Sequence, residues 1–478
     1  MRPDSKLPKL KLHQQARKAF SPAVMAGLVG LLGLVIVLIA ASLPISMVDQ
    51  GDYPRTVSRI IGEPLAPGED AAVHAPHTRW RLQSGLPHPN PSSGTSSLLF
   101  AGAALLQAGY QDRFDLEHLG VAAKSIWVLS LLVLAIAVGK HLALVGTGRI
   151  VLAGVFLLVS FAAHNVAFLQ SFYAEFSFFL GLPMLLVALL WGDGRARLGL
   201  LLVGLLMCGG AKAQFFYLPL LMLAVMWLQA QSRQSRLRSS TLGVLALAQV
   251  LCFAPLLISD VMGFNHHHST YLGSYLAMTE PEREQMGLAP AERACIGVDA
   301  WGNRLLTLDS VDPVPGNSPC PGARSKSLLD TLRPYVAMPS VAVRLIASGL
   351  PPHLTVRYFH VDADAHYVVL TKIHVPTTTR ALMRLTELRD ALIRPWALPL
   401  LLSAVLILAL WRLSRSADDI AAAGLLLILI FISQVIVALL GEGVRDLSKH
   451  LAGAQYALDL MLTLALARAI LAARRRFP

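Results

Sequence analysis

The sequence has little charge and few cysteines for its length. Only 15% of the 478 residues are Asp, Glu, Lys or Arg, whereas 55% are hydrophobic, and the mean hydropathy is +0.57. A soluble protein of several domains needs more polar surface than this, so we exclude that class. The four cysteines are too few for a disulfide-rich secreted scaffold and lack the spacing of zinc ligands. The composition therefore predicts a membrane protein.

Long apolar runs predict the architecture, because a helix needs about 20 apolar residues to cross a bilayer. We predict an all-α polytopic membrane protein with about ten transmembrane helices. Their expected positions are residues 25–43, 124–138, 150–163, 176–190, 198–208, 215–228, 242–257, 396–413, 420–440 and 451–471. The first run lacks a convincing cleavage site, so we expect a retained anchor.

Basic residues gather in the segments that this arrangement places on one side. Residues 1–24, 140–149, 191–198, 231–240, 412–419 and 468–478 hold 19 of the 41 Lys and Arg residues but only four of the 29 acidic ones. The positive-inside rule makes these segments, and both termini, cytoplasmic. The net charge of +12 therefore orients the chain and indicates no nucleic-acid partner.

The sequence divides into four regions on this prediction. They are a basic N-terminus at 1–24, seven helices at 25–257 with a first outer segment at 44–122, a small mixed extracytoplasmic domain at 258–395, and three helices with a basic C-terminus at 396–478. A helix on the membrane surface is expected at 96–110. In the extracytoplasmic domain, Cys295 and Cys320 are expected to form a disulfide, with two free thiols as the alternative.

Charged residues near the outer helix ends are the candidates for chemistry. Asp49 and Asp52 directly follow the first helix and could bind a cation or act as a general base, although solvated loop charges would look the same. Tyr173 and Glu175 lie in the short turn before the fourth helix. Tyr173 is also typical of a membrane-interface residue.

Three basic residues could hold an anion such as a lipid phosphate. Lys212 lies in the break between two apolar helices and is either a functional cation or a snorkelling side chain. Arg445 and Lys449 are four residues apart before the last helix. The alternative for this pair is anchoring at the headgroup level.

Four short segments resemble a known enzyme class. They are residues 49–53 with Arg55, residues 171–175, residues 271–273 with 286–288, and residues 446–451 with Asp459. These segments are similar to those of GT-C membrane glycosyltransferases, and within that class to bacterial hexosyltransferases of cell-surface glycan assembly. The arrangement of a basic N-terminus, many helices and a substantial outer domain is similar as well.

The resemblance implies a GT-C-like fold and an inverting transfer at the outer face of the bacterial inner membrane. A sugar would pass from a polyprenyl-phosphate donor to a cell-envelope glycan or lipid acceptor. The implied roles are Asp52, or Asp49, as general base; Glu175 and Tyr173 for positioning the acceptor; Lys212, Arg445, Lys449 and Arg55 for the donor phosphate; and Phe215, Phe216 and Tyr217 for a lipid groove.

Other functions and partners stay open. The sequence lacks the Asp-x-Asp pair that GT-C enzymes often carry after the first helix, so whether Mg²⁺ or Mn²⁺ takes part is left open. A lipid-linked glycan flippase or transporter, an O-antigen-type polymerase or ligase, and a non-catalytic scaffold are the alternatives. Membrane lipid and other envelope-glycan assembly proteins are the expected partners.

Overall fold

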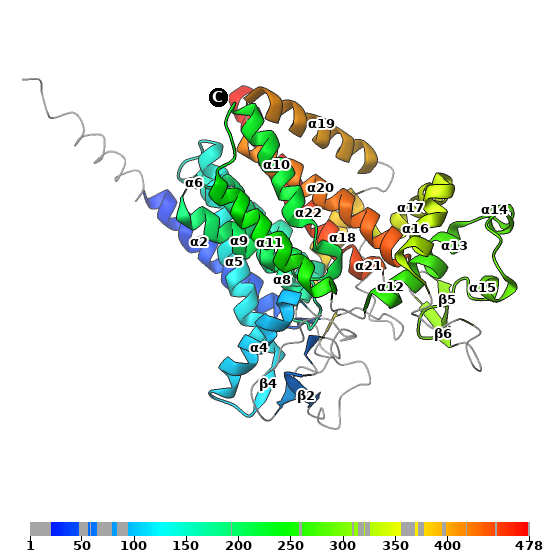
Figure 1. The fold of residues 1–478 in the computed structure, drawn as a ribbon. Helices are drawn as coiled ribbons and strands as arrows, with labels where there is room; N and C mark the ends of the chain where they lie inside the picture. Colours follow the sequence, from blue (N-terminus) through cyan, green and yellow to red (C-terminus); the bar gives the residue numbers. More distant parts are fainter. Residues whose placement is uncertain are drawn as a thin grey trace, which may run out of the picture.

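The long helices of the chain run alongside one another in one bundle (Figure 1). The computed structural model describes residues 21–46, 56–57, 59–64, 79–83, 94–192, 194–257, 261–307, 310–313, 320, 326–354, 369–370, 377–393, 398–416, 418–444 and 447–476. Five stretches of helix within these ranges are long and apolar enough to cross a membrane: Pro22–Ser42, Leu116–His141, Ala213–Ser232, Ser239–Leu257 and Asp419–Glu442. The chain is a mostly helical membrane protein, as its composition predicts.

The helices fall into two sets. The bundle consists of α2 (Pro22–Ser42), α5 (Leu116–His141), α6 (Thr147–Ser160), α7 (Ala163–Phe168), α8 (Phe176–Leu190), α9 (Arg195–Gly209), the short 3₁₀ helix η2 (Ala213–Phe215), α10 (Leu218–Ser232), α11 (Ser239–Leu257), α19 (Leu398–Ser416), α20 (Asp419–Glu442) and α22 (Ala452–Arg476). The others are α4 (Gly94–Ala108), α12 (Val261–Ser269), the π-helix η3 (Thr270–Ser274), α13 (Tyr275–Ala277), α14 (Glu280–Gln285), α15 (Pro290–Ala294), α16 (Leu328–Ala337), α17 (Pro339–Leu354), α18 (Thr377–Leu392) and α21 (Leu447–His450).

The described strands form three small antiparallel sheets. The first pairs β1 (Ile45–Ser46) with β7 (Val369–Leu370), the second has the order β2 (Ile61–Pro64), β3 (Arg79–Leu82), β4 (Arg113–Asp115), and the third is a hairpin of β5 (Asn303–Thr307) and β6 (Ser310–Pro313). The β1–β7 pair joins the end of α2 to a segment more than 300 residues later. It therefore ties the start of the first long loop to the end of the second.

Helix α8 lies at the centre of the bundle, and nearly all its side chains are buried. Two glycines allow it to approach α9 closely. A Cβ atom on Gly181 would lie 2.6 Å from the Cβ of Met207, and one on Gly204 would lie 3.0 Å from the Cα of Leu185. Small residues at such contacts are the usual way in which membrane helices pack, because the bilayer supplies no hydrophobic drive between them.

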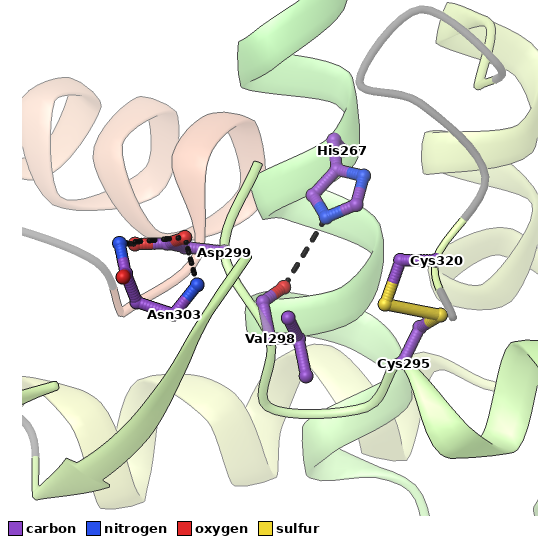
Figure 2. The surroundings of a disulfide bond; sticks show 6 residues. All are labelled: His267, Cys295, Val298, Asp299, Asn303 and Cys320. Atoms are coloured by element: carbon purple, nitrogen blue, oxygen red, sulfur yellow. Dashed lines mark hydrogen bonds between the residues drawn. A yellow bond between two sulfur atoms is a disulfide. The ribbon is translucent and has the colours of Figure 1, made fainter. Parts of the chain in front are cut away.

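The segment between α11 and α19 is built around a disulfide between Cys295 and Cys320, the pairing expected from the sequence (Figure 2). The loop after Cys295 is held by further polar contacts. His267 Nε2 lies 3.2 Å from the Val298 carbonyl oxygen, and Asp299 Oδ1 accepts hydrogen bonds from the backbone N–H of Trp301 and Asn303 at 2.9 and 2.8 Å. This loop is therefore fixed to α12 at its base.

The second apolar helix begins earlier than the sequence predicts. It starts at Leu116, where the Asp115 side chain caps the backbone N–H of Glu117 at 2.8 Å, and not at Lys124. Lys124 is fully buried inside this helix, α5. Its ammonium donates hydrogen bonds to the Ser42 carbonyl at 2.7 Å and to Gln170 Oε1 at 2.8 Å. The predicted run omits residues 116–123, about two turns of the helix.

Candidate functional site

Five ionisable side chains meet where the helices of the bundle end or break. We call Glu175, Lys212, Glu442, Lys449 and His450 the Lys212 cluster. Glu175 precedes α8, Lys212 lies between α9 and η2, Glu442 ends α20, and the other two belong to α21. The structure thus brings together three predicted site residues, Glu175, Lys212 and Lys449, from distant parts of the chain.

Lys212 is held by two partners in a nearly buried position. Its Nζ donates to Glu175 Oε1 at 3.1 Å and to His450 Nδ1 at 2.8 Å. Only 11% of the Lys212 side chain is exposed, and none of that of Glu175. A snorkelling lysine extends into water, so the geometry excludes that alternative for Lys212.

The break that positions Lys212 is closed by the start of α4. Helix α9 ends at Gly209, and the Gly210 carbonyl accepts a hydrogen bond from the Thr95 backbone N–H at 2.7 Å. The Thr95 hydroxyl donates to the Leu206 carbonyl at 2.7 Å. The Gly210 carbonyl thus gains a donor from outside the helix, and the Leu206 carbonyl accepts a second hydrogen bond besides that from the Gly210 N–H. The backbone of Lys212 is consequently free to take the extended conformation it shows.

His450 connects Lys212 to a second carboxylate. Its Nε2 lies 2.5 Å from Glu442 Oε2, and Glu442 Oε1 accepts a hydrogen bond from Asn265 Nδ2 of α12 at 3.4 Å. Burial, helped by the charge on Lys212, lowers the pKa of His450 despite the nearby Glu442. The neutral imidazole accepts at Nδ1 and donates at Nε2, which matches both contacts.

Glu175 has unused acceptor capacity. Its Oε2 is buried and accepts no hydrogen bond from any residue that the structure describes. A buried carboxylate oxygen without a donor is costly, because desolvation is not repaid. Beside it, Tyr173 is buried, and its ring lies under Lys449 with the ammonium 5.0 Å from the ring centroid. The Glu175 oxygen is therefore a candidate acceptor for a donor group of a ligand.

The cluster has nearly balanced charge among its described members. Two lysines face two glutamates, and the neutral form of His450 adds no charge. A bound phosphate would add negative charge to the cluster. Besides Lys212, the cations in this part of the chain are Lys449 and Arg445, four residues before it.

The three predicted groove residues lie in different surroundings. Phe215 is fully buried and stacks on Phe178 with ring centroids 4.4 Å apart. It belongs to the protein core and not to a lipid-facing groove, because the first turn of α8 packs over it. Phe216 and Tyr217 are only half-buried. The Tyr217 hydroxyl donates to Ser433 Oγ at 3.0 Å and accepts from Gln434 Nε2 at 2.6 Å.

Four predicted site residues lie outside the described residues: Asp49, Asp52, Arg55 and Arg445. Thr56, which directly follows Arg55, is held beside the Lys212 cluster by hydrogen bonds. The Thr56 hydroxyl donates to the Phe172 carbonyl at 2.8 Å, and the Ser97 hydroxyl donates to the Thr56 carbonyl at 2.9 Å. Phe172 precedes Tyr173 and lies three residues before Glu175. The chain that follows Asp49 and Asp52 thus joins the turn that carries Glu175.

A second buried cluster, which we call the Asp459 cluster, consists of His164, Asn165, Arg389, Asp390 and Asp459. Asp459 Oδ2 lies 3.0 Å from His164 Nε2 and accepts from Asn165 Nδ2 at 3.0 Å. Its Oδ1 accepts from Arg389 Nε at 2.7 Å, and Arg389 Nη1 donates to Asp390 at 2.8 Å. These contacts attach α18 to α7 and α22.

Only part of the Lys212 cluster could be predicted from the sequence. Glu442 and His450 carried a signal, because ionisable residues at the ends of apolar runs are candidates in membrane proteins. Asn265 carried none, since nothing near it in sequence points toward α20. Within the described ranges, no group of three or more His, Cys, Asp or Glu side chains is placed to hold a metal ion.

Comparisons with known proteins agree with the membrane architecture. The family model described as the YfdI N-terminal transmembrane domain matches residues 9–303. The chain is also similar to the uncharacterized protein YfdI of Escherichia coli strain K12, with 24% identity over 439 residues, which cover 90% of this chain and 93% of that protein. No solved structure matches the chain.

Proposed function

The chain belongs to the YfdI N-terminal transmembrane domain family, and from this premise and the site geometry we propose that it is a membrane glycosyltransferase. It transfers a sugar from a polyprenyl-phosphate donor to a cell-envelope glycan or lipid acceptor. The transfer takes place at the outer face of the bacterial inner membrane. The fold is a GT-C-like bundle of about ten helices with both termini in the cytoplasm. The segment at 258–395 forms a small domain on the outer side.

The Lys212 cluster is the observation that carries this proposal. A lysine fixed between a buried carboxylate and an imidazole keeps its geometry when a substrate arrives. Preorganised cations of this kind stabilise the charge that develops on a leaving phosphate, because they need no reorganisation during the reaction. Lys212, Lys449, Arg445 and Arg55 bind the donor phosphate in this scheme.

Asp52 is the proposed general base, with Asp49 as the alternate. The carboxylate takes the proton of the acceptor hydroxyl, the acceptor oxygen bonds to the anomeric carbon of the sugar, and the bond from that carbon to the phosphate oxygen breaks. Polyprenyl phosphate leaves, and the anomeric configuration inverts. The hydrogen bond from Thr56 to Phe172 supports this role, because it attaches the chain beyond Asp52 to the turn that bears Glu175.

Glu175 and Tyr173 orient the acceptor in this proposal. The free oxygen of Glu175 suits an acceptor hydroxyl, which can donate a hydrogen bond to it. Phe216 and Tyr217, half-buried beside Lys212, line the groove for the prenyl chain. A divalent ion is not required by this scheme, and the proposal includes none.

The test is sugar transfer by the full-length protein in membranes, with a polyprenyl-phosphate sugar as donor. We expect Asp52→Asn to lower the transfer rate by about 10²–10⁴-fold, the usual contribution of a positioned base. Asp112→Asn is the matched control, because Asp112 is an exposed carboxylate of the same loop region, and its rate should equal that of the parent.

Each outcome of this test decides one point. Parental rates in both Asp52→Asn and Asp49→Asn would end the base assignment. A parent protein that never releases polyprenyl phosphate would end the enzyme class.

A flippase for the same lipid-linked molecules is the second candidate. Transporters place charged residues within the membrane, and Lys124 and Asp459 are fully buried inside α5 and α22. A flippase would move the intact donor across the vesicle membrane without releasing lipid phosphate. Release of lipid phosphate that depends on the acceptor would favour the transferase.

A further inference from the structure

Helix α16 exposes four large apolar side chains. Leu329 and Val336 are 78% and 79% exposed, and Leu328 and Leu332 are also exposed, whereas Thr331 is buried. A helix on the surface of a soluble domain shows the reverse pattern. The exposed face of α16 therefore requires a partner other than water.

Three sectors divide the circumference of α16. At 3.6 residues per turn, Leu328, Leu329, Leu332 and Val336 fall within an arc of about 100°. The charged pair Asp330 and Arg333 lies on the next sector and is exposed. Thr331, Pro334 and Tyr335 occupy the remaining sector and are buried against the protein. One side thus contacts protein, one is apolar and one is charged.

The buried sector of α16 packs against the helix that reaches the Lys212 cluster. α16 contacts both α12 and η3, and the Tyr335 hydroxyl lies 3.0 Å from the position that a Cβ on Gly273 would occupy. α12 also carries Asn265, which donates to Glu442. α16 is therefore one helix away from the candidate site.

The next helix, α17, fixes the depth of α16 relative to the bundle. A Cβ on Gly349 of α17 would lie 2.9 Å from Leu439 and 3.3 Å from Val444, at the end of the apolar span α20. Figure 1 shows α16 and α17 beside that end of α20. The apolar sector of α16 is consequently located where a membrane-spanning helix leaves the bilayer.

We propose that α16 is an in-plane membrane helix whose Leu328, Leu329, Leu332 and Val336 side chains insert into the lipid at this end of the bundle. Its charged sector faces water, and its buried sector holds α12 and η3 at the membrane surface. A helix with an apolar face, a charged face and an orientation along the interface binds bilayers in this way. The inference stands apart from the proposed transferase activity.

The composition of the apolar sector favours lipid over another protein. All four of its members are aliphatic, whereas protein interfaces draw most of their binding energy from Trp, Tyr and Arg. The sector also lies close to an apolar helix long enough to cross the membrane, because α16 contacts α17 and α17 contacts α20. If a second copy of the chain or another protein covers the sector, the test below will show low collision rates there.

The test uses nitroxide labels on single cysteines in the full-length protein, reconstituted in vesicles of phosphatidylethanolamine and phosphatidylglycerol. Leu332→Cys and Val336→Cys report the apolar sector, and Asp330→Cys and Arg333→Cys are matched controls on the same helix. Cys208 and Cys252 are buried, and the unsubstituted parent gives the labelling background. Collisions are measured with oxygen, which concentrates in hydrocarbon, and with a nickel chelate, which stays in water.

We expect the ratio of oxygen to nickel collisions to be severalfold higher at 332 and 336 than at 330 and 333. Equal ratios at all four positions would overturn the proposal, since the apolar sector would then face water. Low collision rates with both reagents at 332 and 336 would overturn it as well, because a protein would then cover the sector.

Discussion

The Lys212 cluster and the Asp459 cluster contain similar residues but differ in how the chain presents them. The members of the Lys212 cluster come from segments where helices end or break, and Lys212 and Glu442 are partly exposed, by 11% and 10% of their side chains. Asp459 comes from within α22, and its side chain is fully buried. Both of its oxygens have partners, whereas one oxygen of Glu175 has none among the described residues.

This difference distinguishes the Lys212 cluster, a candidate ligand site, from the Asp459 cluster, which holds helices together. The end of a helix can present a charge to an incoming ligand, whereas both oxygens of Asp459 are already used by neighbouring side chains. A buried cluster of charges loses much when one member is removed, because a buried partner is left without compensation. We therefore expect the Asp459 cluster to determine stability and the Lys212 cluster to determine activity.

The largest effect is expected from Asp459→Ala. It leaves Arg389 and His164 without their shared acceptor, so the free energy of unfolding should fall by about 3–5 kcal/mol. Chemical unfolding in detergent micelles measures this loss. The transfer rate of the remaining folded protein should stay close to that of the parent.

Asp419→Ala provides the matched control. Asp419 lies at the opposite end of α20, where it pairs with Arg233, whose side chain is 46% exposed, and also contacts His141 and Gln229. Contacts that solvent reaches contribute less than fully buried ones, so this variant should lose clearly less stability than Asp459→Ala. Equal losses in the two variants would remove the distinction between the clusters.

The next effect is expected from the double variant Glu175→Gln with Lys212→Gln. It removes both charges together, so the free energy of unfolding should change by no more than about 1 kcal/mol. Sugar transfer should fall by about 10²–10³-fold, the range found when a preorganised charge-stabilising group is lost. Lys124→Met is the matched control, because it removes another buried lysine and should lower stability while leaving transfer by folded molecules intact.

The smallest effect concerns pH and His450. Burial lowers the pKa of His450 below its ordinary value of 6.5 in the folded protein. As the pH falls through about 6.5, the unfolded chain takes up a proton that the folded protein does not, so the folded state loses stability. His450→Gln should lose less stability between pH 7.5 and pH 5.5 than the parent, as measured by thermal unfolding. Identical pH dependence in both proteins would show that His450 does not titrate differently on folding.

Several features of the fold could be predicted from the sequence. The break at Gly209 and Gly210, the apolar runs of α2, α11 and α20, and the Cys295–Cys320 pairing all match the structure. These features depend on residues close in sequence or on few alternatives. The start of α5 was wrong because Lys124 has partners from two other segments, and no local pattern can show that.

The sequence by itself determined that this chain enters a membrane, where its longest apolar helices lie, and that Lys212 stands out as a charge between apolar runs. The tertiary structure alone decided which partners these charges have. Lys212 meets His450 across 238 residues, and Asp459 meets His164 across 295. Helix formation follows from local spacing, whereas the pairing of charges depends on how distant helices pack, and only folding brings those helices together.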